Sequence, residues 1–200
     1  MDPPAADART EAAVEFSHLS VENDRRRTAR KWAVEEVTFA ASAGERTLVF
    51  GLPQAGKSTL VDAIHHPDKY PGRVAVQADV QEFFLKDSHE WSPRDYAAKY
   101  NPELRPGGFL IVDDAYEEAV PYLVRINQGM LVFAGVDGHD CFHRFDRLLY
   151  LSDGRILFDG TPREFFEWVW RTRPPELEHR LGDYLIESGG EMPGCPEIDE

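Results

Sequence analysis

Residues Gly51 to Ser58 read G-L-P-Q-A-G-K-S and match the phosphate-binding pattern G-x-x-x-x-G-K-[ST] at every fixed position. The apolar run Arg46–Phe50 before them predicts a strand, and Ser58–His66 after them has helical apolar spacing that ends before Pro67. Between a strand and a helix, such a loop turns backbone N–H groups toward an anion, and the helix N-terminus adds partial positive charge. The stretch therefore predicts a nucleotide-phosphate site.

The side chains of this loop suit a magnesium nucleotide. We expect Lys57 to reach the β- and γ-phosphates and the hydroxyl of Ser58 to hold Mg²⁺. The alternative is a glycine-containing turn that matches by chance, but the flanking strand and helix favour the phosphate site. The expected cofactor-binding residues of the loop are Gly51, Leu52, Pro53, Gln54, Ala55, Gly56, Lys57, Ser58 and Thr59.

Composition limits the partners. The 200 residues include 22 Lys+Arg and 36 Asp+Glu, a formal net charge of −14, which opposes a nucleic-acid backbone. We therefore expect no nucleic-acid partner. Cys141 and Cys195 lack metal-ligand spacing, and no apolar signal segment opens the sequence, which favours a cytoplasmic setting. No apolar run reaches the roughly 18 residues of a membrane-spanning helix, so membrane association requires a partner.

Two strands are expected before the loop, at Val14–Val21 and Ala33–Ala40. Trp32 precedes the second strand, where it would either stack on a purine base or anchor the core. We interpret the basic segment between the strands as a solvated hairpin tip, with contact to phosphate or an acidic surface as the alternative. Its basic residues are Arg25, Arg26, Arg27, Arg30 and Lys31.

After the loop, Arg73–Gln77 predicts a short strand, and Ala78–Lys86 is an amphipathic stretch of undetermined type. The apolar run Phe109–Val112 predicts a buried parallel strand that ends in Asp113 and Asp114. Following a complete phosphate loop, Asp113 is the expected Mg²⁺ ligand.

The rest of the sequence predicts further helices and strands around one domain. The capping box Thr161–Glu164 opens an aromatic helix, whose aromatic side chains we assign to the core, with a membrane or partner face as the alternative. We expect disorder over Met1–Ala13 and an acidic flexible tail over Ser188–Glu200. The other expected elements are a helix from Ser92, a helix at Pro121–Gln128, strands at Met130–Ala134, Leu148–Leu151 and Arg155–Phe158, the helix Phe165–Trp170 and a last helix in Leu177–Glu187.

The segments up to and including the phosphate loop together resemble the nucleotide-binding domain of an ABC transporter. These segments are the strand-loop-strand, the turn at Gly44-Glu45 and the phosphate loop that continues as S-T-L. The resemblance covers about Val14–Glu187 and implies an α/β P-loop NTPase fold. In that fold a mainly parallel sheet is flanked by helices and preceded by an antiparallel β portion. The segment Phe145–Phe166 (F-D-R-L-L-Y-L-S-D-G-R-I-L-F-D-G-T-P-R-E-F-F) is similar in style to the G subfamily, the pleiotropic-drug-resistance and white-type transporters.

The resemblance also implies roles for residues outside the loop. V-A-V-Q-A-D-V, Val74–Val80, resembles the strand that leads into the family's glutamine loop, which would make Gln77 a sensor of Mg²⁺ and the γ-phosphate. F-L-I-V-D-D, Phe109–Asp114, resembles the second nucleotide motif, which supports Asp113 as a metal ligand and puts Asp114 at the general base. The implied cofactors are ATP and Mg²⁺. The implied partners are a membrane transporter subunit or another nucleotide-binding domain.

Departures from the family pattern bear on catalysis. Nothing between Gln77 and Asp113 matches the signature L-S-G-G-Q. The spacing from Lys57 to Asp113 is too short for the family's helical subdomain, which is expected to be reduced or absent. Asp114 stands where the family has Glu, and the switch histidine position falls on Gly135, with His139 nearby. We therefore expect hydrolysis to be weak or dependent on a partner.

Three other classes of function can share a phosphate loop. A nucleotide-dependent binding or regulatory module would keep the loop without catalysis. A P-loop kinase-like phosphotransferase would need a mobile Arg-bearing lid, for which no convincing segment is present. A GTPase is disfavoured because no guanine-reading [NT]-K-x-D occurs.

Overall fold

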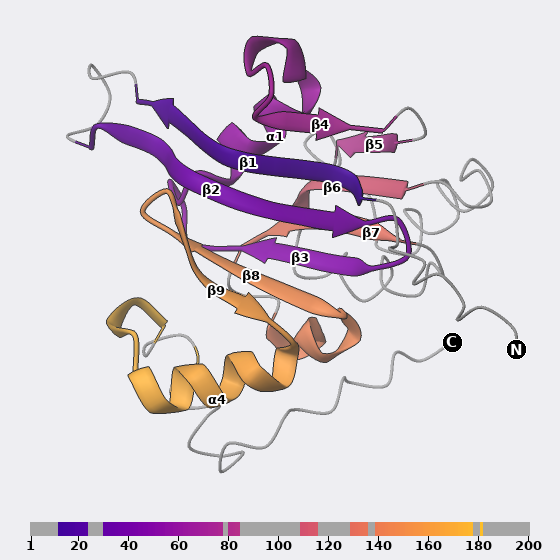
Figure 1. Ribbon diagram of the computed structural model, residues 1–200. Coiled ribbons are helices and arrows are strands. Elements are labelled where there is room, and N and C mark those ends of the chain that lie inside the picture. The colour runs from indigo at the N-terminus through magenta and orange to yellow at the C-terminus, as the bar shows by residue number, and fades with distance from the viewer. Residues whose placement is uncertain are drawn as a thin grey trace, which may run out of the picture.

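The computed structural model describes residues 12–23, 30–77, 80–84, 109–115, 129–135, 139–177 and 181, which form two sheets and their covering helices (Figure 1). The smaller sheet is antiparallel, with the order β2 (Trp32–Ser42), β1 (Ala12–Glu22), β4 (Val74–Val76). The larger sheet has the order β5 (Val80–Phe84), β6 (Phe109–Ala115), β7 (Met130–Ala134), β3 (Arg46–Phe50), β8 (Arg147–Ser152), β9 (Arg155–Gly160). Its strands are parallel except β9, which runs antiparallel to β8.

The larger sheet is covered on both faces. Two α-helices are described, α1 (Lys57–His65) and α4 (Pro162–Thr172), with short 3₁₀ helices η1 (Pro67–Lys69) and η2 (His139–Arg144). Figure 1 shows α1 and the antiparallel sheet on one side and α4 on the other. Because successive side chains of a strand point to opposite faces, Val49 packs with Leu60 of α1, and Phe50 packs with Phe165 of α4. This double burial explains why β3 and β7 read as continuous apolar runs.

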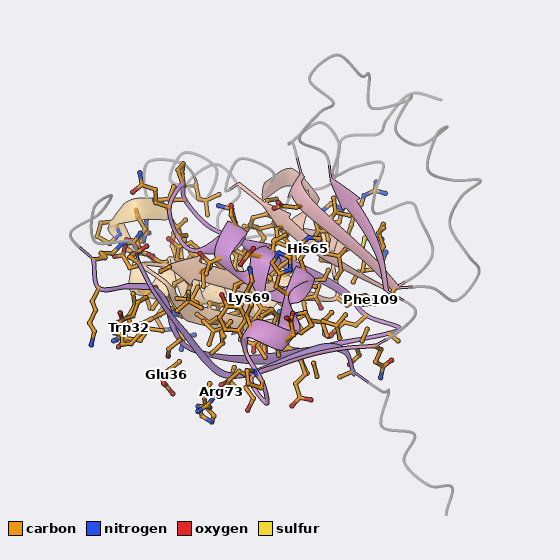
Figure 2. The ribbon with its side chains drawn as sticks, turned by 90° about the horizontal axis from the view of Figure 1, so that it is seen from above. Trp32, Glu36, His65, Lys69, Arg73 and Phe109 are labelled. Carbon is orange, nitrogen blue, oxygen red and sulfur yellow. The ribbon has the colours of Figure 1, made fainter. Side chains whose placement is uncertain are left out.

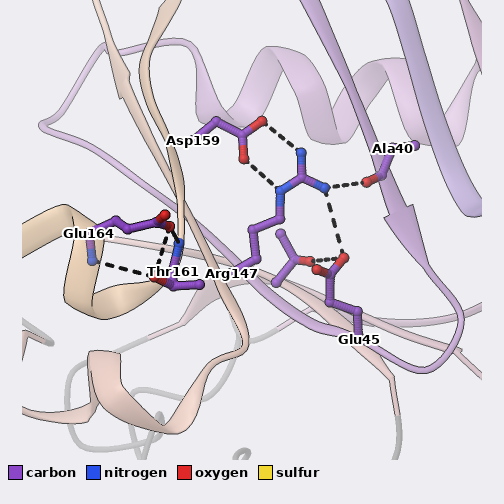
Figure 3. A network of polar contacts seen from close by, with 7 residues as sticks. Ala40, Glu45, Arg147, Asp159, Thr161 and Glu164 are labelled. Carbon is purple, nitrogen blue, oxygen red and sulfur yellow. Dashed lines mark hydrogen bonds and ion pairs between the residues drawn. The ribbon is translucent and has the colours of Figure 1, made fainter.

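Polar contacts fasten the far edge of the larger sheet (Figure 3). Arg147 of β8 makes two hydrogen bonds of 2.6 Å with the carboxylate of Asp159 and donates to the carbonyl oxygen of Ala40 at 2.8 Å. Thr161 and Glu164 form the expected capping box at the start of α4. These contacts hold β8, β9 and α4 in place and thereby fix the strand beside β3.

A buried tyrosine links β8 to the segment after α4. The hydroxyl of Tyr150 lies 3.3 Å from Oε1 of Glu176, and the ring packs against Phe50 and Phe165. Burial raises the pKa of the Tyr150 phenol to about 12. The neutral form is therefore the one the folded chain favours.

The fold class expected from the sequence is confirmed: an α/β fold with a mainly parallel sheet and an antiparallel N-terminal β portion. The amphipathic stretch of undetermined type contains a strand, β5. The first strand starts at Ala12, inside the segment expected to be disordered, because Ala13 is buried against the antiparallel sheet. Trp170 is 45% exposed, so the aromatic side chains of α4 are only partly core residues.

Several expectations lie outside the described residues. These are residues 1–11, the basic residues 25–27, the helices expected from residue 92 and at 121–128, most of 177–187, and the tail 188–200. The signature position and the helical subdomain of the family also fall mostly in residues 85–108, which are outside them. Within the described ranges, no helix combines the length and the apolar character that crossing a membrane requires.

Candidate phosphate-binding site

The loop between β3 and α1 begins with a tight turn. The Ala55 N–H donates to the carbonyl oxygen of Leu52 at 3.1 Å, with Pro53 second in the turn and Gln54 third at φ 67°. Proline at the second position and a positive φ at the third are the pattern of a type II turn. The loop then enters α1 through Gly56, whose φ of 114° favours glycine.

The two pattern glycines let the loop lie close to neighbouring strands. A Cβ on Gly51 would lie 2.2 Å from the carbonyl oxygen of Leu151 in β8, and one on Gly56 would lie 2.6 Å from the carbonyl oxygen of Ala33 in β2. These neighbours are backbone atoms, which cannot turn aside as a flexible side chain can. The glycines therefore serve the packing of the loop onto β2 and β8.

The donors of the loop suit an anion. Nζ of Lys57 donates to the carbonyl oxygens of Gly51 and Leu52, at 2.6 and 3.1 Å, which keeps the ammonium at the loop. No acceptor among the described residues takes the N–H of Gly56 or Ser58. A positive charge and N–H groups at a helix N-terminus are the donors that favour a phosphate, so the chemistry of the loop is compatible with one.

The turn between β8 and β9 supports the loop from one side. The Gly154 N–H donates to the carbonyl oxygen of Ala55 at 2.9 Å, and the Gly154 carbonyl oxygen accepts from the Glu35 N–H at 2.8 Å. Arg30 extends this support because Nη1 lies 2.8 Å from Oδ1 of Asp153 and Nη2 donates to the carbonyl oxygen of Gln54. The strands expected at Leu148–Leu151 and Arg155–Phe158 leave a short connection here, but nothing in the sequence predicted its contact with the loop.

Asp113 ends the regular part of β6 at the same edge of the sheet as the loop. β6, β7 and β3 are consecutive and parallel, so their carboxyl ends meet at one edge. The register between β6 and β7 shifts between Val112 and Ala115, which inserts one extra residue in β6 and makes a β-bulge at Asp113 and Asp114. The Asp113 side chain is half-buried. For Asp114 the structure describes the backbone and not the side chain.

A magnesium ion is compatible with this set of residues. Among the side chains described, no three His, Cys, Asp or Glu groups gather around one point. Mg²⁺ is usually held by one or two protein oxygens together with phosphate and water. The Ser58 hydroxyl and the Asp113 carboxylate at the same edge fit that requirement.

The role expected of Gln77 needs correction. Gln77 follows β4 of the antiparallel sheet, and its N–H donates to the carbonyl oxygen of Ala13 at 3.0 Å. It lies three residues before Val80, the first residue of β5, whose other end pairs with Asp113. Five residues of strand span about 13 Å, so Gln77 lies near the amino edge, away from the phosphate loop. The strand beside β6 is β5, and the segment that follows it is outside the described residues.

Trp32 lies at the same end of the molecule as the loop Gly51–Ser58, where a base bound near the loop could reach it. Figure 2 shows it at the end opposite Phe109, the first residue of β6. The Trp32 side chain is half-buried, and Nζ of Lys31 lies 4.5 Å from its ring centroid, a cation–π contact. One face of the indole is thus covered by Lys31, and the base-stacking role remains a prediction.

The switch position is at the edge of the central strands. Gly135 follows β7, the strand next to β3, and offers no side chain. His139 begins η2, and its side chain is outside the described part of the chain. Gly135 directly follows Ala134, the partner of Phe50, and its assignment to the switch position stays a prediction, as does a substitution by His139.

Known proteins match this chain through structure. No protein-family model matches it, and no curated protein matches it in sequence. CbiO1 from Clostridium perfringens, part of the ABC transporter complex cbiONQ, has a TM-score of 0.58 at 16% identity over 88% of this chain and 99% of that chain. A nucleotide-free ATP-binding cassette from an ABC transporter has a TM-score of 0.57 at 12% identity, over 84% of this chain and 98% of that chain. The ATP-binding cassette MJ0796, in a dimer bound to ADP and Pi, has a TM-score of 0.52 at 15% identity, over 74% of this chain and 98% of that chain.

The sheet order and the loop therefore define the class: this chain has the P-loop NTPase fold of an ABC ATP-binding cassette. In particular, its described residues form the antiparallel β portion and the mainly parallel sheet of that fold, with the loop Gly51–Ser58 after β3.

Proposed function

We propose that this chain binds Mg²⁺–ATP at the loop Gly51–Ser58, as the ATP-binding domain of an ABC transporter assembly. One observation carries the proposal: after the central strand of an ABC-type sheet, the loop Gly51–Ser58 matches the phosphate pattern, and the Lys57 ammonium lies on its carbonyl oxygens at the N-terminus of α1. The matched cassettes support it, since one of them is bound to ADP and Pi.

The residues would share the work as follows. Lys57 exchanges its bond to the Gly51 carbonyl for the β- and γ-phosphates, and backbone N–H groups of the loop bind the remaining phosphate oxygens. Ser58 and Asp113 hold Mg²⁺, which neutralises phosphate charge when it is bound. Trp32 stacks on the purine base. Gln77 is left out of the site, because its position on the antiparallel sheet is remote from the loop.

Hydrolysis by the chain alone is proposed to be weak. Asp114 would orient the attacking water with a side chain one methylene shorter than the family's Glu, and Gly135 has no side chain with which to contact the γ-phosphate. Since no signature segment is recognised in the sequence, a partner would have to supply the missing donors. We propose as partner a membrane transporter subunit or another nucleotide-binding domain, with the chain on the cytoplasmic side. The only support for assigning the chain to the G subfamily is the sequence resemblance of the segment Phe145–Phe166.

A nucleotide-dependent binding module without catalysis is the second candidate. Gly135 at the switch position favours it, because this glycine removes a side-chain contact to the γ-phosphate while leaving the phosphate loop intact. The two candidates share ATP binding and differ in turnover.

Equilibrium titration of the full chain tests the proposal. ATP, GTP and ADP are titrated with and without Mg²⁺, and we expect Mg²⁺–ATP to bind more tightly than Mg²⁺–GTP, because no guanine-reading motif is present. Absence of saturable ATP binding by a folded chain would refute the proposal. Equal affinities for ATP and GTP would refute the base preference but leave the phosphate site in place.

A further inference from the structure

One residue of the phosphate loop is poorly suited to its conformation. Gln54 has a φ of 67° at the third position of the turn Leu52–Ala55. Glycine or asparagine normally occupies that position, because other side chains crowd the backbone there. Something outside the turn must therefore stabilise the conformation of Gln54.

Arg30 provides a contact suited to this purpose. Its guanidinium donates from Nη2 to the carbonyl oxygen of Gln54 and from Nη1 to Oδ1 of Asp153, the latter at 2.8 Å. A planar guanidinium can hold two acceptors in fixed directions, which an ammonium cannot. The Arg30 side chain is 31% exposed and that of Asp153 is 84% exposed, so the pair lies at the surface but is anchored at two points.

The next carbonyl of the loop is also held. Gly154, directly after Asp153, donates its N–H to the carbonyl oxygen of Ala55 at 2.9 Å. Two consecutive loop carbonyls, those of Gln54 and Ala55, thus each have a fixed donor. Because N–H and C=O point in opposite directions across a trans peptide, fixing the Ala55 carbonyl also fixes the direction of the Gly56 N–H, while the Ala55 N–H stays in the turn bond to Leu52.

We propose that Arg30 is a positioning residue of the phosphate site: held by Asp153, it fixes the Gln54 carbonyl and so keeps the turn in the shape that presents the loop N–H groups. The ligand in this inference is the nucleotide phosphate of the proposed function. The effect is local, because an exposed ion pair by itself adds little to global stability.

Amide hydrogen exchange of the full chain without nucleotide tests the positioning role directly. The Ala55 amide reports on the turn and the Val49 amide in β3 reports on the core. We expect Arg30→Ala to raise the exchange rate of Ala55 about five- to thirtyfold, the factor that corresponds to a non-glycine residue in the left-handed region, and to leave Val49 unchanged. Arg163→Ala, which removes an arginine ion pair on α4, is the matched control and should change neither rate.

A second substitution separates positioning from general loosening. In the Gln54→Gly background the left-handed conformation is intrinsically allowed, so Arg30→Ala should raise Ala55 exchange much less than in the wild type. An unchanged Ala55 rate in Arg30→Ala, or an equal effect in both backgrounds, would overturn the inference. If Arg30→Ala also raises the exchange rate of the Val49 amide, Asp153→Asn is measured in its place. Faster exchange of the Ala55 amide in Asp153→Asn supports the inference, and exchange at the wild-type rate overturns it.

ATP titration completes the test. Arg30→Ala should weaken ATP binding, and Arg30→Lys, which keeps the charge but lacks the planar fork, should weaken it less. If the wild-type chain binds no ATP, the proposed function fails, whereas the exchange of Ala55 still decides the role of Arg30. Faster exchange with unchanged ATP affinity would show that the turn is held by Arg30 but that its shape does not matter to the ligand, which also overturns the inference.

Discussion

Nζ of Lys57 lies 2.6 Å from the carbonyl oxygen of Gly51, so the first residue of α1 binds back to the residue that follows β3. The contact closes the loop on itself. Because the lysine already lies across the loop, a phosphate needs to replace only a carbonyl acceptor and not to order a free side chain, which lowers the entropic cost of binding.

Lys57→Ala should weaken ATP binding strongly. The lost interaction is a charge-assisted hydrogen bond worth about 1.5–3 kcal/mol, or roughly ten- to a hundredfold in affinity. Isothermal titration with ATP measures the change. Lys69→Ala is the control, since Lys69 is an exposed lysine just after α1 whose ion pair with Asp62 does not involve the loop. Equal ATP affinity in folded Lys57→Ala and wild type would contradict the assigned role.

Asp113→Asn and Ser58→Ala should each remove the Mg²⁺ dependence of ATP binding. Asp113→Asn removes the carboxylate charge and Ser58→Ala removes the hydroxyl oxygen at the shared edge of β6 and β3, while the phosphate contacts of Lys57 and the loop backbone remain. Binding without metal should therefore stay close to that of the wild type. Titration with and without Mg²⁺ gives the comparison, and a Mg²⁺ dependence that survives Asp113→Asn would show that this aspartate is not the metal ligand.

The isolated chain should hydrolyse ATP very slowly and remain monomeric with Mg²⁺–ATP. Each donor on the γ-phosphate is worth on the order of 2.7–4 kcal/mol in a closed, dry site, and Gly135 contributes none from a side chain. A displacement of the attacking water near 1 Å costs about a hundredfold, so the shorter Asp114 slows the reaction further. Phosphate-release and sedimentation assays check both points. Rapid turnover by a monomer, abolished by Asp114→Asn, would contradict this prediction.

Gly154→Ala should destabilise the chain more than Gly72→Ala. Both glycines have positive φ, 81° and 70°, but a Cβ on Gly154 would lie 2.7 Å from the carbonyl oxygen of Ala33, whereas one on Gly72 would have nothing within 4 Å. The conformational term costs each variant about 1–2 kcal/mol, and the clash adds roughly 1–3 kcal/mol at Gly154. Urea unfolding measures both free energies, and similar losses would mean that the backbone of β2 yields easily.

Tyr150 should make stability fall in alkali. Its folded-state pKa of about 12 lies above the ordinary value of 10.0, so its contribution is complete below pH 10 and is lost as the pH rises to 12. The loss amounts to about 1–2 kcal/mol. Tyr150→Phe keeps the ring in the core but lacks the titrating hydroxyl, so its stability should fall less over this range. Parallel slopes for the two proteins in urea unfolding between pH 10 and 12 would argue against the raised pKa.

The sequence predicted the strands of the core well, because apolar runs bounded by glycine leave little choice. Arg46–Phe50 and Met130–Ala134 were expected with the bounds that the structure has. Such runs can be buried on both faces only inside a parallel sheet, which also fixes Asp113 at the edge that carries the loop.

Tertiary pairing explains what the sequence did not predict. The alternation in V-A-V-Q predicts a strand but not its partner, and pairing of β4 with β1 takes Gln77 to the Ala13 end of the antiparallel sheet, opposite the Trp32 end that lies near the loop. The contacts of Arg30 with Gln54 and Asp153 join three segments distant in the chain, and no local pattern marks such contacts.

The position of β3 also has a consequence for the order of folding. Residues 46–50 pair on one side with residues 130–134 and on the other with residues 147–150, so both neighbours of this strand come from much later in the chain. Closing such long chain segments is entropically unfavourable and slows folding. During synthesis, the ribosome must therefore release β7 and β8 before the phosphate loop gains its scaffold, so ATP cannot assist the nascent chain at early stages.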